Sequence, residues 1–243
     1  MGEAITVKAF EGLPHEILAE ARARIAAVAA AAGVSTLVEA LRIRLEGVAG
    51  GVLAQVNAEV DGRRIRIQEA AGFGEALDRV TEALRERIGA VTGSWAPRPW
   101  PLAPRRGAAV VAVPAGGGPK VVRVKEPSLV WCSPEAATRT MDAMDYDIHL
   151  FTDPATETDA VVYRVGPTGY RLARTTAAAP PRRGSVPLTL SPCAAPRLSE
   201  AQAVGRLVDA ELPFLFFAHP VSGRGRVLYR RFDGHLGLIA GKA

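Results

Sequence analysis

"VLYRRFDGHLGLI", residues 227–239, has an earlier counterpart in "VVYRVGPTGYRL", residues 161–172. In both stretches apolar and polar side chains alternate on either side of a short turn, which predicts two strands joined by that turn. The similarity extends without a gap over residues 133–172 and 199–238, at a constant offset of 66 positions. The identical pairs include Ser133/Ser199, Ala137/Ala203, Phe151/Phe217, Pro154/Pro220, Val161/Val227, Tyr163/Tyr229, Arg164/Arg230 and Leu172/Leu238. The sequence therefore predicts that one small module occurs twice.

Each copy of the module contains the same series of predicted elements. A leading strand, "KVVRVKE" or "SVPLTLS", precedes a helix that begins at Ser133 or Ser199, and serine is favoured at helix N-termini. A strand, a turn, a second strand and a final short strand follow. We assign residues 120–175 to repeat 1, residues 185–243 to repeat 2, and residues 176–184 to a linker.

The region before the repeats has a different pattern. "AITVKAF" alternates like a strand, and Pro14 opens a helical stretch that ends at Gly33. Three more alternating stretches follow, the last two joined at Asp61-Gly62, a strong hairpin signal. A second helix is predicted over residues 74–91. The order β-α-β-β-β-α predicts a four-stranded sheet with two helices on one face, spanning residues 1–95. With the two tandem small α/β repeats, the fold class is α+β.

Charge is distributed unevenly along the chain. The net charge is +5, and residues 96–119, rich in proline, glycine and arginine, lack sustained periodicity and are predicted to be a linker. Residues 1–95 carry 11 basic and 13 acidic side chains, and residues 96–125 carry six basic and no acidic ones. Residues 126–175 carry four basic and eight acidic side chains, and residues 176–243 carry nine basic and four acidic ones. The basic excess therefore lies in the linker and in repeat 2.

Several protein classes are disfavoured by composition. No apolar run approaches the roughly 18 residues that a membrane helix needs, so we expect no membrane association. The N-terminus "MGEAITVKAF" lacks the basic and apolar regions of a signal peptide. Two cysteines, Cys132 and Cys193, provide no disulfide framework, and we interpret them as buried free thiols. These features predict a cytoplasmic protein.

The two repeats are predicted to pair with each other. A module of some 55 residues is marginally stable alone, and "FLFF" at residues 214–217 is more apolar than one thin layer can bury. The opposite charges of the repeats favour pairing between unlike copies, although independent repeats are the alternative. Pairing within one chain would reproduce a homodimer interface with pseudo-two-fold symmetry. The residues predicted for this interface are Phe151, Val161, Tyr163, Phe214, Phe217, Val227 and Tyr229.

These stretches resemble a known family, the long-form ribosome hibernation promoting factors. The resemblance rests on the V-V-Y-R-type strand, the following turn, the phenylalanine-rich strand "FLFFAHP" and the helix starts "SPEAA" and "LSEAQA". Repeat 2 fits that family's C-terminal domain closely, whereas repeat 1 departs from it in its turn and in Arg171, which replaces a glycine. The order of elements in residues 1–95 is similar to the family's ribosome-binding domain. The tandem tail resembles a variety found in actinobacteria.

The resemblance implies a function in translation control. The N-terminal domain would bind the decoding region of the small ribosomal subunit, block mRNA and tRNA binding, and protect idle ribosomes under stress or dormancy. In the common long form, one C-terminal domain pairs with its twin on a second ribosome. The implied partners are the small-subunit rRNA and, as further candidates, ribosomal proteins near the mRNA path.

Arginine and lysine side chains would contact rRNA, because RNA is recognised largely through phosphates and shape. The alternative for any one of them is a solvated arginine that offsets the acidic residues. Ala27 and Gly89-Ala90 replace residues that are usually basic in the family, and the linker arginines could compensate. The predicted rRNA-binding residues are Lys8, Arg22, Arg24, Arg42, Arg44, Arg64, Arg66, Arg79, Arg85 and Arg87.

An enzyme is not expected. The four histidines lack metal-ligand spacing, and no nucleotide-binding or nucleophile motif occurs. The acidic residues Asp142, Asp145, Asp147 and Asp153 do not have EF-hand spacing, and we interpret them as a solvated helix end. No cofactor and no metal site are therefore predicted.

Three functional hypotheses follow. In the first, the protein is a hibernation factor whose tails pair within one monomeric chain, so that ribosomes stay single. In the second, the tails pair between chains, giving a homodimer and dimeric ribosomes. In the third, the protein is an interaction scaffold without ribosome binding.

Overall fold

The computed structural model describes residues 5–9, 14–31, 38–48, 51–98, 117–166, 169–180 and 184–242. The chain forms two compact units, an N-terminal unit and a C-terminal unit that holds both repeats. Helices and strands are mixed in both units, which confirms the α+β class. Most of the predicted linker 96–119, and residues 181–183 of the second linker, lie outside the described residues. The domain boundaries therefore stay predictions.

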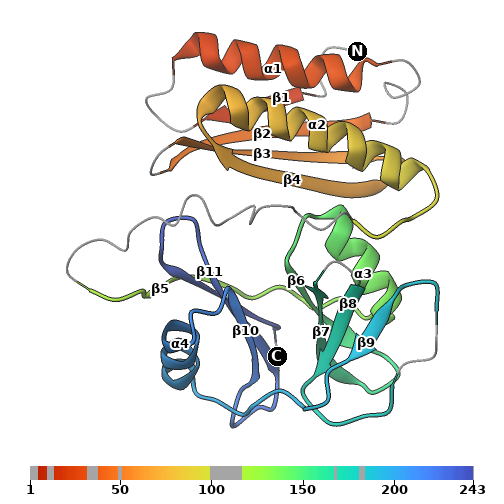
Figure 1. Cartoon of the computed structure of the whole chain (residues 1–243), viewed down its shortest axis with the longest axis vertical. Coiled ribbons are helices and arrows are strands. Elements are labelled where there is room, and N and C mark those ends of the chain that lie inside the picture. The colour runs from red at the N-terminus through yellow and green to blue at the C-terminus, as the bar shows by residue number, and fades with distance from the viewer. Residues whose placement is uncertain are drawn as a thin grey trace. The chain divides into compact units, whose positions relative to one another are not determined.

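The N-terminal unit is a four-stranded sheet whose strands are neighbours in chain order (Figure 1). β1 runs parallel to β2, while β2, β3 and β4 are antiparallel to one another. The elements are β1 (Ile5–Ala9), α1 (His15–Ala29), β2 (Val38–Val48), β3 (Gly51–Val60), β4 (Arg63–Ala71) and α2 (Phe73–Thr92). The predicted order β-α-β-β-β-α is confirmed.

Both helices of this unit cover the same face of the sheet. Alternate residues of each strand face inward, because side chains of a strand point to opposite sides in turn. One cluster buries these residues with the inner sides of α1 and α2. Its members include Ala21, Ile25, Leu41, Ile43, Leu45, Val56, Ala58, Ile65, Ile67, Leu77, Val80 and Leu84. The opposite face of the sheet carries none of this cluster, and we call it the open face because most of its polar side chains are exposed or half-buried.

The turn between β3 and β4 fixes the register of the hairpin. Asp61 and Gly62 both have positive φ angles, 49° and 65°, as a two-residue turn that matches strand twist requires. Val60 consequently pairs with Arg63, and the pairing continues along both strands. This register places Ile65 and Ile67 inward and Arg64 and Arg66 outward.

The C-terminal unit contains two four-stranded sheets and two helices. In each repeat a serine hydroxyl caps the helix, as predicted: Ser133 accepts from the Ala136 amide at 3.2 Å, and Ser199 forms a capping box with Gln202. The elements are β5 (Val121–Lys125), α3 (Pro134–Ala143), β6 (Ile148–Asp153), β7 (Thr158–Val165), β8 (Gly169–Arg174), β9 (Leu188–Leu190), α4 (Glu200–Asp209), β10 (Phe214–Ala218), β11 (Gly225–Arg230) and β12 (Leu236–Ala240).

The two repeats exchange their leading strands. The strand orders are β10-β11-β12-β5 and β6-β7-β8-β9, so each leading strand completes the sheet of the other repeat (Figure 1). β5 pairs in parallel with β12, and β9 pairs in parallel with β8. The sequence predicted both strands but not their exchange. The pattern of a short strand is the same whichever sheet edge it joins, so periodicity alone does not choose the edge.

The two sheets are built in the same register. Phe151 pairs with Ala160 in one sheet, and their equivalents 66 positions later, Phe217 and Arg226, pair in the other. The exchanged strands obey the same offset, since Arg171 pairs with Thr189 and Gly237 with Arg123. The sequence repeat is therefore also a structural repeat, with two similar halves related by an approximate two-fold rotation.

Candidate nucleic-acid interface and repeat interface

The open face of the N-terminal sheet carries polar side chains in two rows across the strands. The register places Thr6, Arg42, Asn57 and Arg66 side by side in one row. The second row consists of Lys8, Arg44, Gln55 and Gln68. Asn57 and the two glutamines were not predicted, although the alternation along β3 and β4 would have found them.

Five of the ten predicted rRNA-binding residues lie on this open face: Lys8, Arg42, Arg44, Arg64 and Arg66. The first four are exposed, and Arg66 is half-buried. Arg44 forms an ion pair with Glu46 at 3.0 Å, whereas Lys8, Arg42 and Arg64 form no ion pair within the described part of the chain. Unpaired cations on an open surface are available to phosphate groups.

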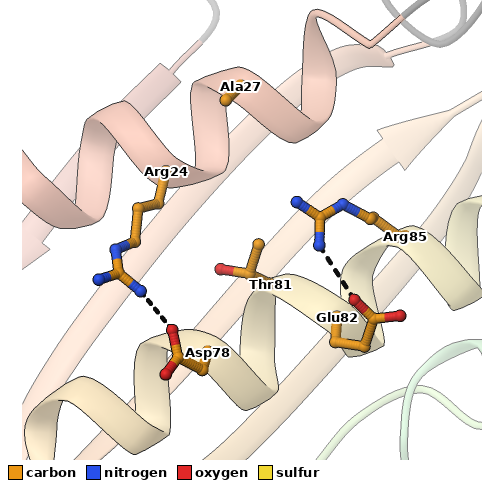
Figure 2. A pocket seen from close by; sticks show the side chains of 6 residues that line it. All are labelled: Arg24, Ala27, Asp78, Thr81, Glu82 and Arg85. Carbon is orange, nitrogen blue, oxygen red and sulfur yellow. Dashed lines mark hydrogen bonds and ion pairs between the residues drawn. The ribbon is translucent and has the colours of Figure 1, made fainter.

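Four other predicted residues lie on the helices, against the opposite side of the sheet. Figure 2 shows the depression between α1 and α2, which is lined by Arg24, Ala27, Asp78, Thr81, Glu82 and Arg85. Arg24 forms ion pairs with Asp78 and Glu20, and the hydrogen bond that its guanidinium donates to Asp78 raises the pKa of Arg24. Arg85 pairs with Glu82, and Arg79 with Glu75. Acidic neighbours thus offset three of these cations, while Arg22 is exposed.

Arg87 differs from the other nine, because only 7% of its surface is exposed. The structure thus separates the predicted residues into a cationic sheet face, a charge-compensated helix face and one buried arginine. The sheet face is the stronger candidate for RNA, since its positive charge is the less neutralised. The sequence prediction counted the helix arginines as RNA-binding without identifying the carboxylates that form ion pairs with them.

The interface between the repeats is an apolar cluster with members from both. Its buried residues are Leu150, Val161, Ala173, Phe216 and Val227, and the half-buried residues packed against it are Leu129, Ile148, Tyr163, Ala195 and Ile239. Four pairs of these are equivalents at the 66-residue offset: 129 with 195, 150 with 216, 161 with 227, and 173 with 239. Equivalent residues from both repeats thus contribute to this interface, as an approximate two-fold relation between the repeats predicts.

The predicted interface residues fall into two groups. Val161, Val227 and Tyr163 belong to the cluster, and Phe214 packs edge-on against Tyr163 with 5.6 Å between ring centroids. Phe217 lies instead in the core of repeat 2 with residues of α4. Its equivalent, Phe151, is fully buried and stacks against His149.

The remaining predicted residue, Tyr229, lies under the Lys125 ammonium, which is 5.5 Å from its ring centroid. Phe216 and Leu150, which were not predicted, occupy the interface positions next to Phe217 and Phe151. Strict two-residue alternation within "FLFF" assigns Phe214 and Phe216 to one face and Phe217 to the other.

The acidic residues interpreted as a solvated helix end include buried groups, and that interpretation is wrong for Asp142, Asp145 and Asp153. Asp153 is fully buried and accepts two hydrogen bonds from Arg174, at 2.7 and 3.0 Å. Asp142 is 5% exposed and accepts a hydrogen bond from the Tyr170 hydroxyl. Buried carboxylates require such partners, and the partners come from β8, some 20 to 30 positions later in the chain.

Two further groups have altered acid–base properties. Burial lowers the pKa of His149 to about 4, so its imidazole is neutral at physiological pH. Burial raises the pKa of the Cys132 thiol, with the Asp153 carboxylate adding to the effect. Cys193 is exposed and Cys132 is half-buried, which corrects the expectation that both thiols are buried. Within the described ranges, no three histidine, cysteine, aspartate or glutamate side chains gather as metal ligands would. No helix there is long and apolar enough to cross a membrane.

Comparison with known proteins identifies the family. Residues 117–172 match the model described as "Sigma 54 modulation/S30EA ribosomal protein C terminus". The match falls on repeat 1, although repeat 2 showed the closer resemblance in its strand–turn–strand. The chain is also 42% identical over 198 residues to the "Dormancy associated translation inhibitor" of two Mycobacterium tuberculosis strains, CDC 1551 and H37Rv. That alignment covers 78% of this chain and 71% of the relative. The chain therefore belongs to the family of long-form ribosome hibernation promoting factors, of the actinobacterial type.

Proposed function

We propose that this protein binds the small ribosomal subunit, inhibits translation and preserves idle ribosomes during dormancy. The name of the mycobacterial relative and the ribosomal family of repeat 1 support this function. The observation that carries the proposal for this chain is the cationic open face of the N-terminal sheet. No catalytic chemistry is needed, because occupying the mRNA and tRNA path is sufficient to stop translation.

The open sheet face would be the surface that contacts rRNA in the decoding region. Lys8, Arg42 and Arg64 present charge without ion-pair partners among the described residues, and the half-exposed Gln55 and Asn57 lie between the basic strands. Flat polar surfaces of this kind suit RNA, whose phosphates and 2′-hydroxyls are accessible without base-specific fit. The amides would hydrogen-bond to the same backbone.

The tails would be paired within the chain, so that ribosomes bound by this protein stay single. Two observations support this part of the proposal. The repeats exchange β5 and β9, which completes both sheets, and the apolar face of each repeat is buried in the common cluster. A repeat whose face is buried in this cluster does not offer that face to a second ribosome.

A binding experiment with matched variants tests the RNA-contacting face. The variant Arg42→Gln/Arg44→Gln removes two charges from the sheet face, and Arg79→Gln/Arg85→Gln removes two from the helix face. Binding to purified small subunits is measured by co-pelleting over a range of salt concentrations. The logarithm of the association constant falls linearly with the logarithm of the salt concentration, and each lost phosphate contact makes this slope less steep by about 0.7 to 0.9. We expect the sheet variant to bind more weakly, with a slope less steep by about 1.5. The helix variant should keep the affinity and the slope of the unmodified protein.

If the helix variant instead lost more affinity than the sheet variant, the RNA-contacting surface would be on the helices. Absence of salt-sensitive binding by the unmodified protein would reject ribosome binding and leave an interaction scaffold as the function.

A further inference from the structure

The two-fold relation between the repeats brings an aspartate and its glycine counterpart together at the axis. Positions 159 and 225 are equivalent, since they differ by 66, yet repeat 1 has an aspartate and repeat 2 a glycine. The Gly225 amide donates a hydrogen bond to Asp159 Oδ2 at 2.8 Å. A residue that bonds to its own counterpart lies next to the axis, where a substitution in one repeat directly alters a contact with the other.

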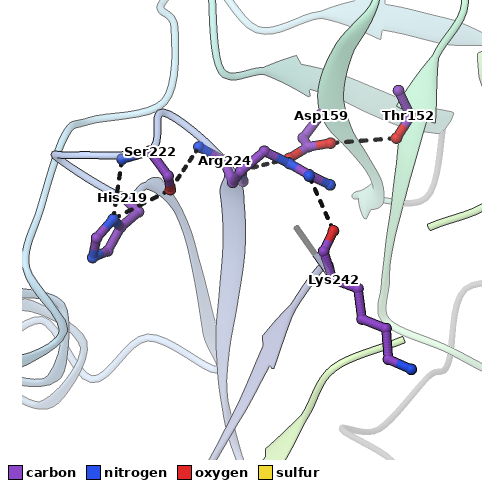
Figure 3. Close-up of polar contacts among 7 residues, drawn as sticks. Thr152, Asp159, His219, Ser222, Arg224 and Lys242 are labelled. Carbon is purple, nitrogen blue, oxygen red and sulfur yellow. Dashed lines mark hydrogen bonds and ion pairs between the residues drawn. The ribbon is translucent and has the colours of Figure 1, made fainter. Parts of the chain in front are cut away.

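A single carboxylate fills the space at this position. Asp159 is 5% exposed and also accepts from Arg224 Nε at 2.7 Å and from the Thr152 hydroxyl at 3.3 Å (Figure 3). Arg224 in turn donates to the Lys242 carbonyl at 3.0 Å. The buried charge is thereby compensated by groups from both repeats, as a desolvated carboxylate requires.

The space at the axis admits one side chain and not two. A β-carbon on Gly225 would come 2.7 Å from the β-carbon of Asp159, and 2.9 Å from Phe216 Cε2. Two aspartates here would also place two carboxylates side by side in a buried site, which is strongly unfavourable. The cation at this site likewise comes from repeat 2 and has no counterpart in repeat 1, where Thr158 occupies the position equivalent to Arg224.

Two glycines would be unsatisfactory for the opposite reason. A pair of repeat-2 faces would bury two amides at the axis with no carboxylate to accept from them, and would leave two copies of the partly exposed Arg224 without an acidic partner. Unsatisfied buried donors each destabilise a fold. Only the unlike combination supplies one carboxylate, one free space and one guanidinium.

We propose that Asp159 and Gly225 make the pairing face of each repeat selective for the unlike repeat. Repeat 1 accepts repeat 2 and rejects a second copy of itself, and repeat 2 does the same. The preference works through attraction in the unlike pair and through repulsion in the like pairs, as selective interfaces generally do. The inference rests on the tail pairing proposed above and not on ribosome binding.

The selectivity has a direct consequence for assembly. Like-with-like pairing, in which identical tails of two chains meet, is disfavoured at the axis of this protein. The unlike partner is present in the same chain at high effective concentration, so pairing within the chain satisfies both faces. The family's usual means of joining two ribosomes through identical tails is thereby removed.

The test exchanges the two residues in the full-length free protein. Gly225→Asp creates the Asp/Asp pair, Asp159→Gly creates the Gly/Gly pair, and the double variant restores an unlike pair in reverse. Glu157→Gln, which removes an exposed charge from the turn just before β7, is the control. Thermal unfolding of the C-terminal unit and sedimentation mass at two concentrations are measured for each.

We expect Gly225→Asp to lower the melting temperature by about 10 °C or more and Asp159→Gly by about 5 °C. The reverse double variant should be more stable than Gly225→Asp, and the control should match the unmodified protein. Equal melting temperatures for Gly225→Asp and the control would overturn the proposal. So would a double variant no more stable than Gly225→Asp.

A milder substitution covers the case in which Gly225→Asp does not fold. Gly225→Ala adds only the β-carbon and is compared in the unmodified and the Asp159→Gly backgrounds. The conflict with Phe216 is present in both backgrounds and cancels from the comparison. We expect a smaller loss of melting temperature in the Asp159→Gly background, whereas equal losses would show that the two positions do not interact. These measurements use no ribosomes, so they fail or succeed separately from the proposed function.

Discussion

The ring of Tyr229 covers Gly237 on the neighbouring strand: a β-carbon at Gly237 would lie 2.3 Å from Tyr229 Cζ. The two residues are directly opposite each other in the β11–β12 pair. In repeat 1 the equivalent pair is Tyr163 and Arg171, and there the tyrosine packs against Phe214. The absence of a side chain at Gly237 thus leaves room for the Tyr229 ring in repeat 2.

Substitution of that glycine should destabilise repeat 2. Gly237→Ala forces the Tyr229 ring away from its position and from Lys125, and we expect a loss of about 1 to 3 kcal/mol in unfolding free energy. Gly205→Ala is the matched control, because no heavy atom lies within 4 Å of its added carbon and alanine favours helix α4. Denaturant unfolding should show opposite signs for the two variants. A stabilised Gly237→Ala would contradict the packing described for Tyr229.

Breaking the buried ion pair between Asp153 and Arg174 should greatly lower the unfolding free energy, and removing the second charge as well should restore part of it. Asp153→Asn leaves the guanidinium without its counter-charge at a site where Arg174 is 3% exposed, and breaking such a pair costs about 3 to 5 kcal/mol. The double variant Asp153→Asn/Arg174→Met should recover part of that loss, since no charge is left unpaired. Chemical denaturation of the three proteins measures both effects.

An exposed ion pair supplies the comparison for Asp153. Glu135→Gln breaks the exposed pair with Arg139 and should leave the denaturation curve nearly unchanged, because solvent screens it. If the two carboxylate variants behaved alike, the burial assigned to Asp153 would be incorrect.

Stability of the C-terminal unit should decrease in mild acid because of His149. Its folded-state pKa is about 4 against an ordinary 6.5, so between these values the unfolded chain binds more protons than the folded one. The stabilising contribution is complete above about pH 6.5 and is lost as the pH falls towards 4. At one pKa unit per 1.36 kcal/mol, the full loss is about 3 kcal/mol.

The variant His149→Phe isolates this effect, because phenylalanine keeps a ring against Tyr146 and Phe151 without a titrating group. Unfolding free energies are measured from pH 4 to pH 7, with the exposed His15→Gln as control. We expect a flatter profile for His149→Phe only. Identical profiles for all three proteins would show that His149 does not titrate in this range.

Local sequence signals predicted much of this fold. Alternation identified the inward faces of β2, β3 and β4, the Asp61-Gly62 turn identified a hairpin, and serines identified the starts of α3 and α4. Each of these signals depends on a few neighbouring residues, so it can be interpreted without knowing how the rest of the chain folds. The repeat itself was also visible, because equal positions recur at one offset.

Relations between distant segments were not predictable in the same way. The exchange of β5 and β9, the partner of Asp153 and the meeting of residues 159 and 225 all depend on which sheet edges join. The assignment of Phe217 to the interface, rather than Phe216, reflects a run of apolar residues in which both faces of β10 are buried. When both faces are apolar, hydrophobicity does not tell which one meets the partner repeat.

Sedimentation of purified ribosomes with this protein through a sucrose gradient tests the central claim most directly. The account predicts that the protein migrates with single ribosomes and does not increase the amount of paired particles, because each tail is already paired with its neighbour in the same chain. Migration with paired ribosomes would contradict pairing within the chain, and absence of the protein from every ribosomal fraction would contradict its role as a hibernation factor.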